Sequence, residues 1–236
     1  MKISSVALAI IGDEVLLGEV VDENIHIVSR EVFRLGADLS YACVLPDDPQ
    51  FMYEHLKWMM ERFDWVVSTG GIGATHDDLT KQVVCRIFGR PLVEAPEVIR
   101  ALESRIGGPL PEKVLELARV PEGAELVTNE RTAAPGFIVG NLLVLPGIPS
   151  LVQSMIGVLG EKLSGKAFHT LVIHTMLRES EVAESLEIVQ AQYPSVKIGS
   201  YPEMEAVDHK VRIVLRSRDS ESLLKAQGSL LERIDK

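Results

Sequence analysis

Basic residues are scarce in this chain of 236 residues, which has 24 Lys and Arg against 34 Asp and Glu. The formal net charge is -10 at pH 7. A protein that holds a nucleic-acid backbone does so through massed Lys and Arg, so this balance argues against a nucleic-acid partner. Cysteine is scarcer still, and Cys43 and Cys85 have no paired spacing that suggests zinc or a redox couple. We interpret them as reduced core thiols of a cytoplasmic protein.

Long hydrophobic runs are also absent, and no stretch of the sequence approaches the length of a membrane span. The opening residues carry one early lysine and an apolar run at residues 6–11, as a signal peptide would. That run is too short, and Gly12-Asp13-Glu14 follows where small residues would be needed for cleavage. We therefore expect no membrane partner, and we predict that this segment is the first buried strand.

Short apolar runs alternate with amphipathic segments from residue 3 to about residue 165. This alternation predicts an α/β sheet covered by helices. Strands are expected at residues 3–11, 41–45, 65–69 and 137–145, the last interrupted by a turn at Gly140-Asn141. Helices are expected at residues 24–36, 49–63, 79–88, 96–106, 111–117 and 149–163.

A linker is predicted at Ser164-Gly165-Lys166, which divides the chain into domains at residues 1–165 and 166–236. In the second domain, strands are expected at residues 169–177, 196–201 and 211–216, with helices at 179–192 and 220–234. This β-α-β-β-α order fits a small α+β module. Its basic residues form no dense stripe, so we expect no RNA binding.

The segment STGGIGATHDD, residues 68–78, places three glycines within four positions between an expected strand and an expected helix. Glycines there allow backbone N–H groups to approach a phosphate with no Cβ in the way. The spacing matches neither a dinucleotide-binding fingerprint nor a Walker loop. The alternative is a tight turn that merely needs positive φ.

Two aspartates, Asp77 and Asp78, follow this glycine loop. One aspartate would suffice to cap the next helix. Two carboxylates beside a phosphate are tolerable if Mg²⁺ or another divalent metal lies between them. His76, inside the same motif, is interpreted as a solvent-facing loop residue, with general acid or metal ligand as the alternative.

Other predicted strands are also followed by acidic residues or glycine. Asp47 and Asp48 follow the second strand, and Asp48 before a proline is an ordinary helix cap, whereas Asp47 has no such role. Asp22 lies beyond the first strand, and capping the next helix is an equally good interpretation for it. The segment at residues 146–150 offers further N–H groups to an anion. Convergence of four strand ends is stronger evidence for a site than any one of them.

Together, GDEVLLGEVVDEN, VLPDD, STGGIGATHDDLT and LPGIP resemble the molybdopterin-binding (MoaB/Mog-like) family, in particular its CinA-type branch. The resemblance covers residues 3 to about 160, in the family's order. It implies a three-layer αβα domain followed by a small KH-like module. CinA-type proteins continue into a nicotinamide-mononucleotide amidase domain, whereas this sequence stops at Lys236, so we expect no amidase activity.

The resemblance also implies roles for single residues. Asp78 would be the acid that acts with metal and nucleotide, Asp77 the first member of the CinA-type pair, and Asp47 the family's other functional acid. The implied ligand-binding residues are Thr69, Gly70, Gly71 and Gly73 in the glycine loop, Gly147 and Pro149 in the second phosphate-facing loop, and Asp22 and Asn24 in a polar stretch that lines the pocket. The implied metal ligands are Asp77 and Asp78.

The sequence departs from the CinA pattern at three positions: Ala74 replaces a usual proline, Thr132 a usual glycine, and Leu151 a usual glutamate. These departures leave the substrate open. The leading hypothesis is a metal-dependent hydrolase of a nucleotide-sugar pyrophosphate, resembling the CinA-type ADP-ribose pyrophosphatase.

One alternative is a molybdopterin-binding protein or adenylyltransferase in molybdenum cofactor biosynthesis, and another is a non-catalytic nucleotide- or pterin-binding module. Each predicts a small phosphorylated ligand as the partner. The resemblance also implies a homo-oligomer, because relatives are commonly dimers or trimers.

Overall fold

The computed structural model describes residues 3–234 and divides the chain into two compact units, one ending at Gly165 and the other beginning at Lys166. The first unit is built on a six-stranded sheet in the order β2-β1-β3-β8-β7-β6. Four neighbouring strands are parallel: β2 (Asp38–Leu45), β1 (Ser5–Ile11), β3 (Trp65–Thr69) and β8 (Leu142–Leu145). Next to β8 lies β7 (Gly136–Val139), which pairs with it antiparallel, and β6 (Glu125–Val127) pairs antiparallel with β7 at the edge of the sheet.

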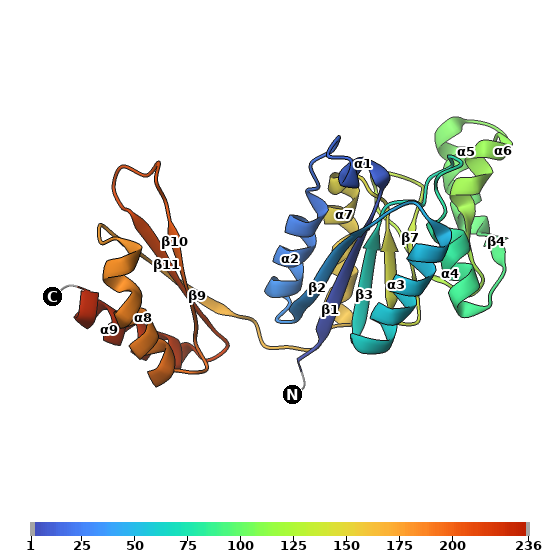
Figure 1. Cartoon of the computed structure of the whole chain (residues 1–236). Coiled ribbons are helices and arrows are strands. Elements are labelled where there is room, and N and C mark those ends of the chain that lie inside the picture. The colour runs from blue at the N-terminus through green and yellow to red at the C-terminus, as the bar shows by residue number, and fades with distance from the viewer. Residues whose placement is uncertain (1–2, 235–236) are drawn as a thin grey trace. The chain divides into compact units, whose positions relative to one another are not determined.

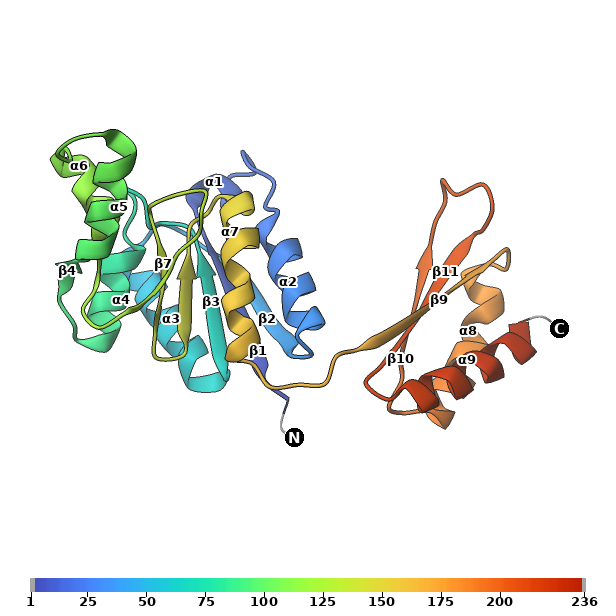
Figure 2. The same cartoon turned by 180° about the vertical axis from the view of Figure 1, so that it is seen from behind.

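The central strands are apolar on both faces, as parallel strands between two helical layers must be. Val6, Leu8 and Ile10 of β1 pack into one core with α2 (Asn24–Arg34), α7 (Pro149–Met155) and the 3-10 helix η2 (Ile156–Glu161). Alternate residues Ala7 and Ala9 pack into the other core, with α3 (Pro49–Arg62) and α4 (Thr80–Phe88). Figures 1 and 2 show the two helical layers on opposite faces of the sheet. The expected three-layer αβα architecture is confirmed.

Several short elements could not be predicted correctly from the sequence pattern. Beyond the sheet lie α5 (Pro96–Ile106), α6 (Glu112–Leu115) and the 3-10 helix η1 (Glu116–Ala118), so the helix expected at residues 111–117 is broken. A two-stranded ribbon of β4 (Leu92–Glu94) and β5 (Arg119–Pro121), together with α1 (Asp13–Leu16) and β6, was not expected from the sequence. Elements of three or four residues are too short to show a periodicity.

The helix expected at residues 149–163 remains α-helical only to Met155 and continues as η2. Gly157 and Gly160 lie in this second part, and glycine is a poor α-helix former. The turn expected at Gly140-Asn141 is present and joins β7 to β8 as a hairpin. Asn141 supports it by donating from Nδ2 to the carbonyl oxygens of Met60 at 3.0 Å and Phe63 at 3.2 Å.

The second unit has the expected β-α-β-β-α order. Its elements are β9 (His169–Thr175), α8 (Glu179–Gln192), β10 (Lys197–Pro202), β11 (Val211–Ser217) and α9 (Ser220–Ile234). The three strands form an antiparallel sheet in the order β10-β11-β9. Ile213 of β11 and Val189 of α8 are fully buried in its own core. No helix within residues 3–234 is long and apolar enough to cross a membrane.

Candidate functional site

The four predicted strand ends lie next to one another at one edge of the sheet. Because β2, β1, β3 and β8 are adjacent and parallel, their carboxyl ends emerge on the same side. The loops that follow them line one cavity of about 490 Å³. Ligands of open α/β sheets bind at this edge. The lining residues include Gly12, Glu14, Asp47, Gly70, Gly71, Gly73, Asp77, Asp78, Gly147 and Pro149.

Gly70 begins the loop after β3 and serves mainly to shape it. Its φ is 100°, and a Cβ there would overlap the carbonyl oxygen of Ile11. Its amide donates to the carbonyl oxygen of Leu145 at 3.1 Å. The expected phosphate contact through the Gly70 amide is therefore unsupported, because this N–H is used inside the fold.

Gly71 and Gly73 keep the next part of the loop free of side chains. Gly71 has φ 66°, and a Cβ on it would overlap the hydroxyl oxygen of Thr80. A Cβ on Gly73 would lie against the carboxylate of Asp78. The amides of Gly71, Ile72 and Gly73 have no hydrogen-bond partner within residues 3–234. Three consecutive N–H groups at the cavity wall are suited to an anion.

Asp78 closes this loop instead of capping the next helix. Its Oδ2 accepts hydrogen bonds from the amide of Thr75 at 2.9 Å and from the Thr75 hydroxyl. Its Oδ1 accepts none from the described part of the chain. Helix α4 begins after Leu79, which has no side-chain cap. Two hydrogen bonds therefore fix one oxygen of Asp78, and the other stays unbonded among residues 3–234, an arrangement that helix capping does not explain.

Asp77 and Asp47 reach the same cavity from two different loops. The Oδ2 of Asp47 accepts from the amide of Asp13 at 3.0 Å, and the Oδ1 of Asp13 accepts from the amide of Asp47 at 3.3 Å. Burial raises the pKa of Asp47, and the neighbouring charges of Asp13, Asp77 and Asp78 add to that rise. The cavity therefore has an acidic wall whose carboxylates interact electrostatically.

These carboxylates do not by themselves form a metal-binding cluster. In the portion that the structure describes, no group of three or more His, Cys, Asp and Glu side chains could hold a metal ion. Mg²⁺, however, is commonly bound through only one or two carboxylates together with phosphate oxygens of the substrate. Asp78, with one oxygen unbonded, and Asp77 fit such a shared site. His76 contributes little, because its side chain is 95% exposed.

Asp22, Asn24 and Thr69, which were expected at the site, have structural roles, and Asp48 is the helix cap that the sequence predicts. Asp22 accepts from the amide of Ile25 at 2.9 Å and so caps α2, and Asp48 accepts from the amide of Phe51 at 2.7 Å and caps α3. Asn24 and Thr69 are both buried. The Nδ2 of Asn24 donates to the carbonyl oxygen of Gly147 at 2.8 Å and lies 3.5 Å from the Thr69 hydroxyl. These bonds place the loop of Gly147 against α2, and none of these four residues lines the cavity.

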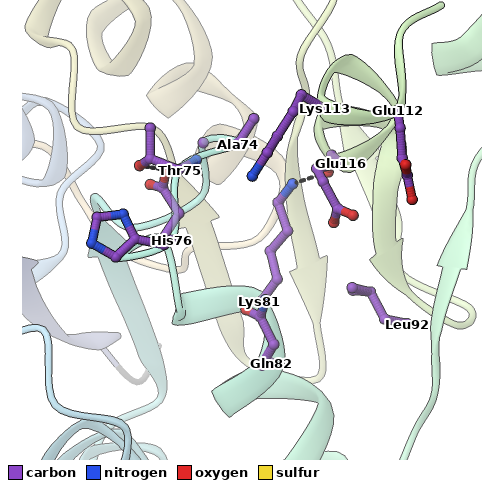
Figure 3. A pocket seen from close by; sticks show the side chains of 11 residues that line it. Ala74, Thr75, His76, Lys81, Gln82, Leu92, Glu112, Lys113 and Glu116 are labelled. Carbon is purple, nitrogen blue, oxygen red and sulfur yellow. Dashed lines mark hydrogen bonds between the residues drawn. The ribbon is translucent and has the colours of Figure 1, made fainter.

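A second cavity, of about 450 Å³, borders the glycine loop (Figure 3). It shares Gly73 and Asp78 with the first cavity. The rest of its lining comes from the glycine loop, α4, β4, α6 and η1: Ala74, Thr75, His76, Lys81, Gln82, Leu92, Glu112, Lys113 and Glu116. Lys81 of α4 is only 5% exposed and donates from Nζ to the carbonyl oxygen of Glu116 at 2.7 Å. Burial lowers the pKa of Lys81 to about 8.

Sequence reasoning missed Lys81. A signal was available, because Lys81 shares a helical face with the buried Val84, three residues on. A lysine on the apolar face of an amphipathic helix is unusual, since Lys is almost never fully buried unless it is paired. Glu116 and Lys113 lie in the helix expected at residues 111–117, but no local pattern indicated that this segment packs beside α4.

Comparisons with known proteins match the chain in two parts. Residues 7–165 match the family described as "Probable molybdopterin binding domain", and residues 167–236 match the one described as "FAD synthase, middle domain". A protein of Archaeoglobus fulgidus is 32% identical over 92% of both chains. A CinA-like protein of Gemmatimonas aurantiaca is 29% identical over 96% of this chain, which spans 57% of that relative's length.

Among solved structures, the protein CinA from Thermoplasma acidophilum is 23% identical, with a TM-score of 0.63 over 68% of this chain and 98% of its own. This likeness shows a common fold. The family match covers the whole sheet domain, including all four loops of the first cavity. The chain therefore belongs to the MoaB/Mog-like molybdopterin-binding family, and CinA-like proteins are among its relatives.

Proposed function

We propose that this protein hydrolyses the phosphoric anhydride of a nucleotide sugar with the help of a divalent metal. The observation that carries the proposal is the wall of the first cavity, which combines amides that are unbonded among residues 3–234 with several carboxylates. Amides alone would serve a simple anion, and carboxylates alone would repel it. Both together suit an anion that arrives with a cation.

The amides of Gly71, Ile72 and Gly73 would hold the oxygens of one phosphate and stabilise the charge that grows on them in the transition state. The loop is already in place before a ligand binds, since Thr80 holds it at two points. The Thr80 hydroxyl donates to the carbonyl oxygen of Gly70 at 3.0 Å, and its amide donates to that of Gly71 at 3.0 Å. Pre-organised donors of this kind need little rearrangement during the reaction.

Asp78, with Asp77 or Asp47, would hold the metal, most simply Mg²⁺, which when bound polarises phosphate oxygens and helps to orient a water. Asp47 is well suited to accept the proton of the attacking water. Its pKa is raised by burial and by the neighbouring carboxylates, which makes it a stronger base than an ordinary aspartate.

Incubation of the protein with ADP-ribose and Mg²⁺ is expected to release AMP and ribose 5-phosphate, measured by chromatography. The Asp78→Asn variant should lose at least about 100-fold in rate, the size of effect typical of a group that acts in the transition state. Glu61→Gln, at an exposed carboxylate on α3 paired only loosely with Arg62, is the matched control and should keep full activity. No turnover by the wild-type protein with any divalent metal would refute the proposal.

Family membership favours one second candidate, a molybdopterin-binding protein or adenylyltransferase of molybdenum cofactor biosynthesis. Calorimetric titration with molybdopterin and with ADP-ribose separates the two, because a pterin needs a flat apolar slot that a sugar does not. Binding of either ligand without any product would instead favour a non-catalytic module.

A further inference from the structure

The second cavity contains a buried cation whose charge is not balanced by an ion pair. The side chain of Lys81 extends from α4 to Glu116, and Lys113 of α6 points into the same cavity (Figure 3). The one hydrogen bond of Lys81 within residues 3–234 goes to a backbone carbonyl oxygen, that of Glu116. An ammonium has three donors, so two of them remain for another partner.

Glu116, whose carbonyl oxygen accepts this bond, already has a partner for its carboxylate. Glu116 accepts from the guanidinium of Arg119, which also lies 3.5 Å from Glu94. No carboxylate in the described part of the chain lies within ion-pair distance, 4.0 Å, of the Lys81 ammonium. Burying a charge without a counter-ion is costly. Asp78 and Glu116, which line the same cavity with Glu112, act on the Lys81 charge without forming an ion pair with it. The two remaining donors of the ammonium are therefore open to an anion.

The cavity is also joined to the proposed catalytic loop. Gly73 and Asp78 border both cavities, so an anion beside Lys81 would be a neighbour of a phosphate held by the Gly71–Gly73 amides. Asp78 is near enough to Lys81 to act on its charge. A ligand with two linked phosphates is therefore the kind of ligand that would use both cavities.

We propose that the second cavity is an anion subsite in which the ammonium of Lys81, with Lys113 at the rim, binds a phosphate group. The assignment of this phosphate to the hydrolysed ligand rests on the proposed function. The existence of the subsite does not depend on that function. Lys81 acts here as a fixed cation and an anion-binding residue. The alternative is a structural role, in which Lys81 only ties α4 to the segment of Glu116.

The probes are ribose 5-phosphate and inorganic phosphate, titrated calorimetrically without metal. Lys81→Met keeps the apolar stem and removes the charge, and it should weaken ribose 5-phosphate binding at least tenfold, as the loss of a charge-assisted hydrogen bond implies. Lys113→Met, at an exposed residue, should weaken it by about two- to threefold. Lys57→Met, on the exposed surface of α3, is the matched control and should leave the affinity unchanged.

Lys113→Glu provides a test that does not depend on a change in the core. It places a negative charge at the rim of the cavity and should weaken phosphate binding by about fivefold or more, with the melting temperature unchanged. If Lys81→Met lowers the melting temperature but binds ribose 5-phosphate as tightly as the wild type, Lys81 is a structural tie and the subsite is refuted.

The two proposals fail in different ways. If the wild-type protein does not hydrolyse ADP-ribose but Lys81→Met still loses phosphate binding, the proposed function is wrong and the subsite stands. If ADP-ribose is hydrolysed and Lys81→Met changes neither KM nor phosphate affinity, the subsite is wrong and the proposed function stands.

Discussion

At the scale of single residues, glycines that look alike in the sequence have different roles. Gly70 is required because its neighbour Ile11 leaves no room for a Cβ, and its amide is bonded inside the fold. Gly71 is equally crowded, but its amide is unbonded among residues 3–234 and borders the cavity. The tight-turn interpretation thus holds for Gly70, whereas anion binding at Gly71 stays a prediction.

Gly71→Ala should be much more harmful than alanine at another left-handed glycine. Gly89, the C-cap of α4, has φ 62° against 66° for Gly71, and a Cβ on Gly89 would meet nothing within 4 Å. Gly89→Ala should therefore cost about 1–2 kcal/mol of unfolding free energy, the strain of a left-handed residue. Gly71→Ala adds overlap with Thr80 and should also abolish ligand binding. Urea denaturation measures the loss of unfolding free energy, and calorimetry measures ligand affinity. Equal losses of unfolding free energy in Gly71→Ala and Gly89→Ala would contradict this prediction.

At the scale of elements, helix α4 combines a structural face with a functional one. Val83 and Val84 pack into the core, whereas Lys81, equally buried, turns its ammonium into the second cavity. The helix starts directly after the loop closed by Asp78, so its first turn fixes both the glycine loop and the buried cation. Its stability is therefore linked to the protonation of Lys81.

Lys81 should make the protein less stable near neutral pH than at alkaline pH. Its pKa is about 8 in the folded chain against 10.5 in the unfolded one, so the unfolded chain binds more protons between these values. The free energy of unfolding therefore rises with pH through this window, by at most about 3 kcal/mol from Lys81. Comparing denaturation of wild type and Lys81→Met at pH 7 and pH 10 isolates the effect. The wild type should gain stability relative to Lys81→Met as pH rises, and an unchanged difference between the two proteins would contradict this prediction.

At the scale of the whole molecule, two units with separate cores carry separate family matches. The first and second cavities are lined only by residues of the first unit. The proposed chemistry therefore requires no side chain from residues 166–234. The second unit has its own three-stranded sheet, with two helices packed on its core.

A core substitution in the second unit should leave the first unit's ligand binding intact. Ile213 is fully buried there, and Ile213→Ala should cost about 2–5 kcal/mol of that unit's unfolding free energy. Urea denaturation is expected to show two transitions, of which only one moves. ADP-ribose affinity measured at low urea should be unchanged. A single shifted transition, or a lost affinity, would show that the units unfold and act as one.

Most of the architecture could be predicted from the sequence, because long elements carry strong periodicity. The bounds of α5, α8, α9 and β3 agree with expectation, and the buried pattern of β1 follows from its unbroken apolar run. Capping by Asp48 was also predictable, since an aspartate before a proline has one dominant local role. These are short-range effects, in which neighbours along the chain decide the outcome.

The sequence by itself determined the order of the long strands and helices and the family, because those depend on local periodicity and local motifs. Only the tertiary structure decided which groups are available for chemistry. The amide of Gly70 donates to Leu145, Asn24 and Thr69 are buried, and the Lys81 ammonium has no ion-pair partner among residues 3–234. Each of these depends on partners distant in the sequence, whose approach no local pattern encodes.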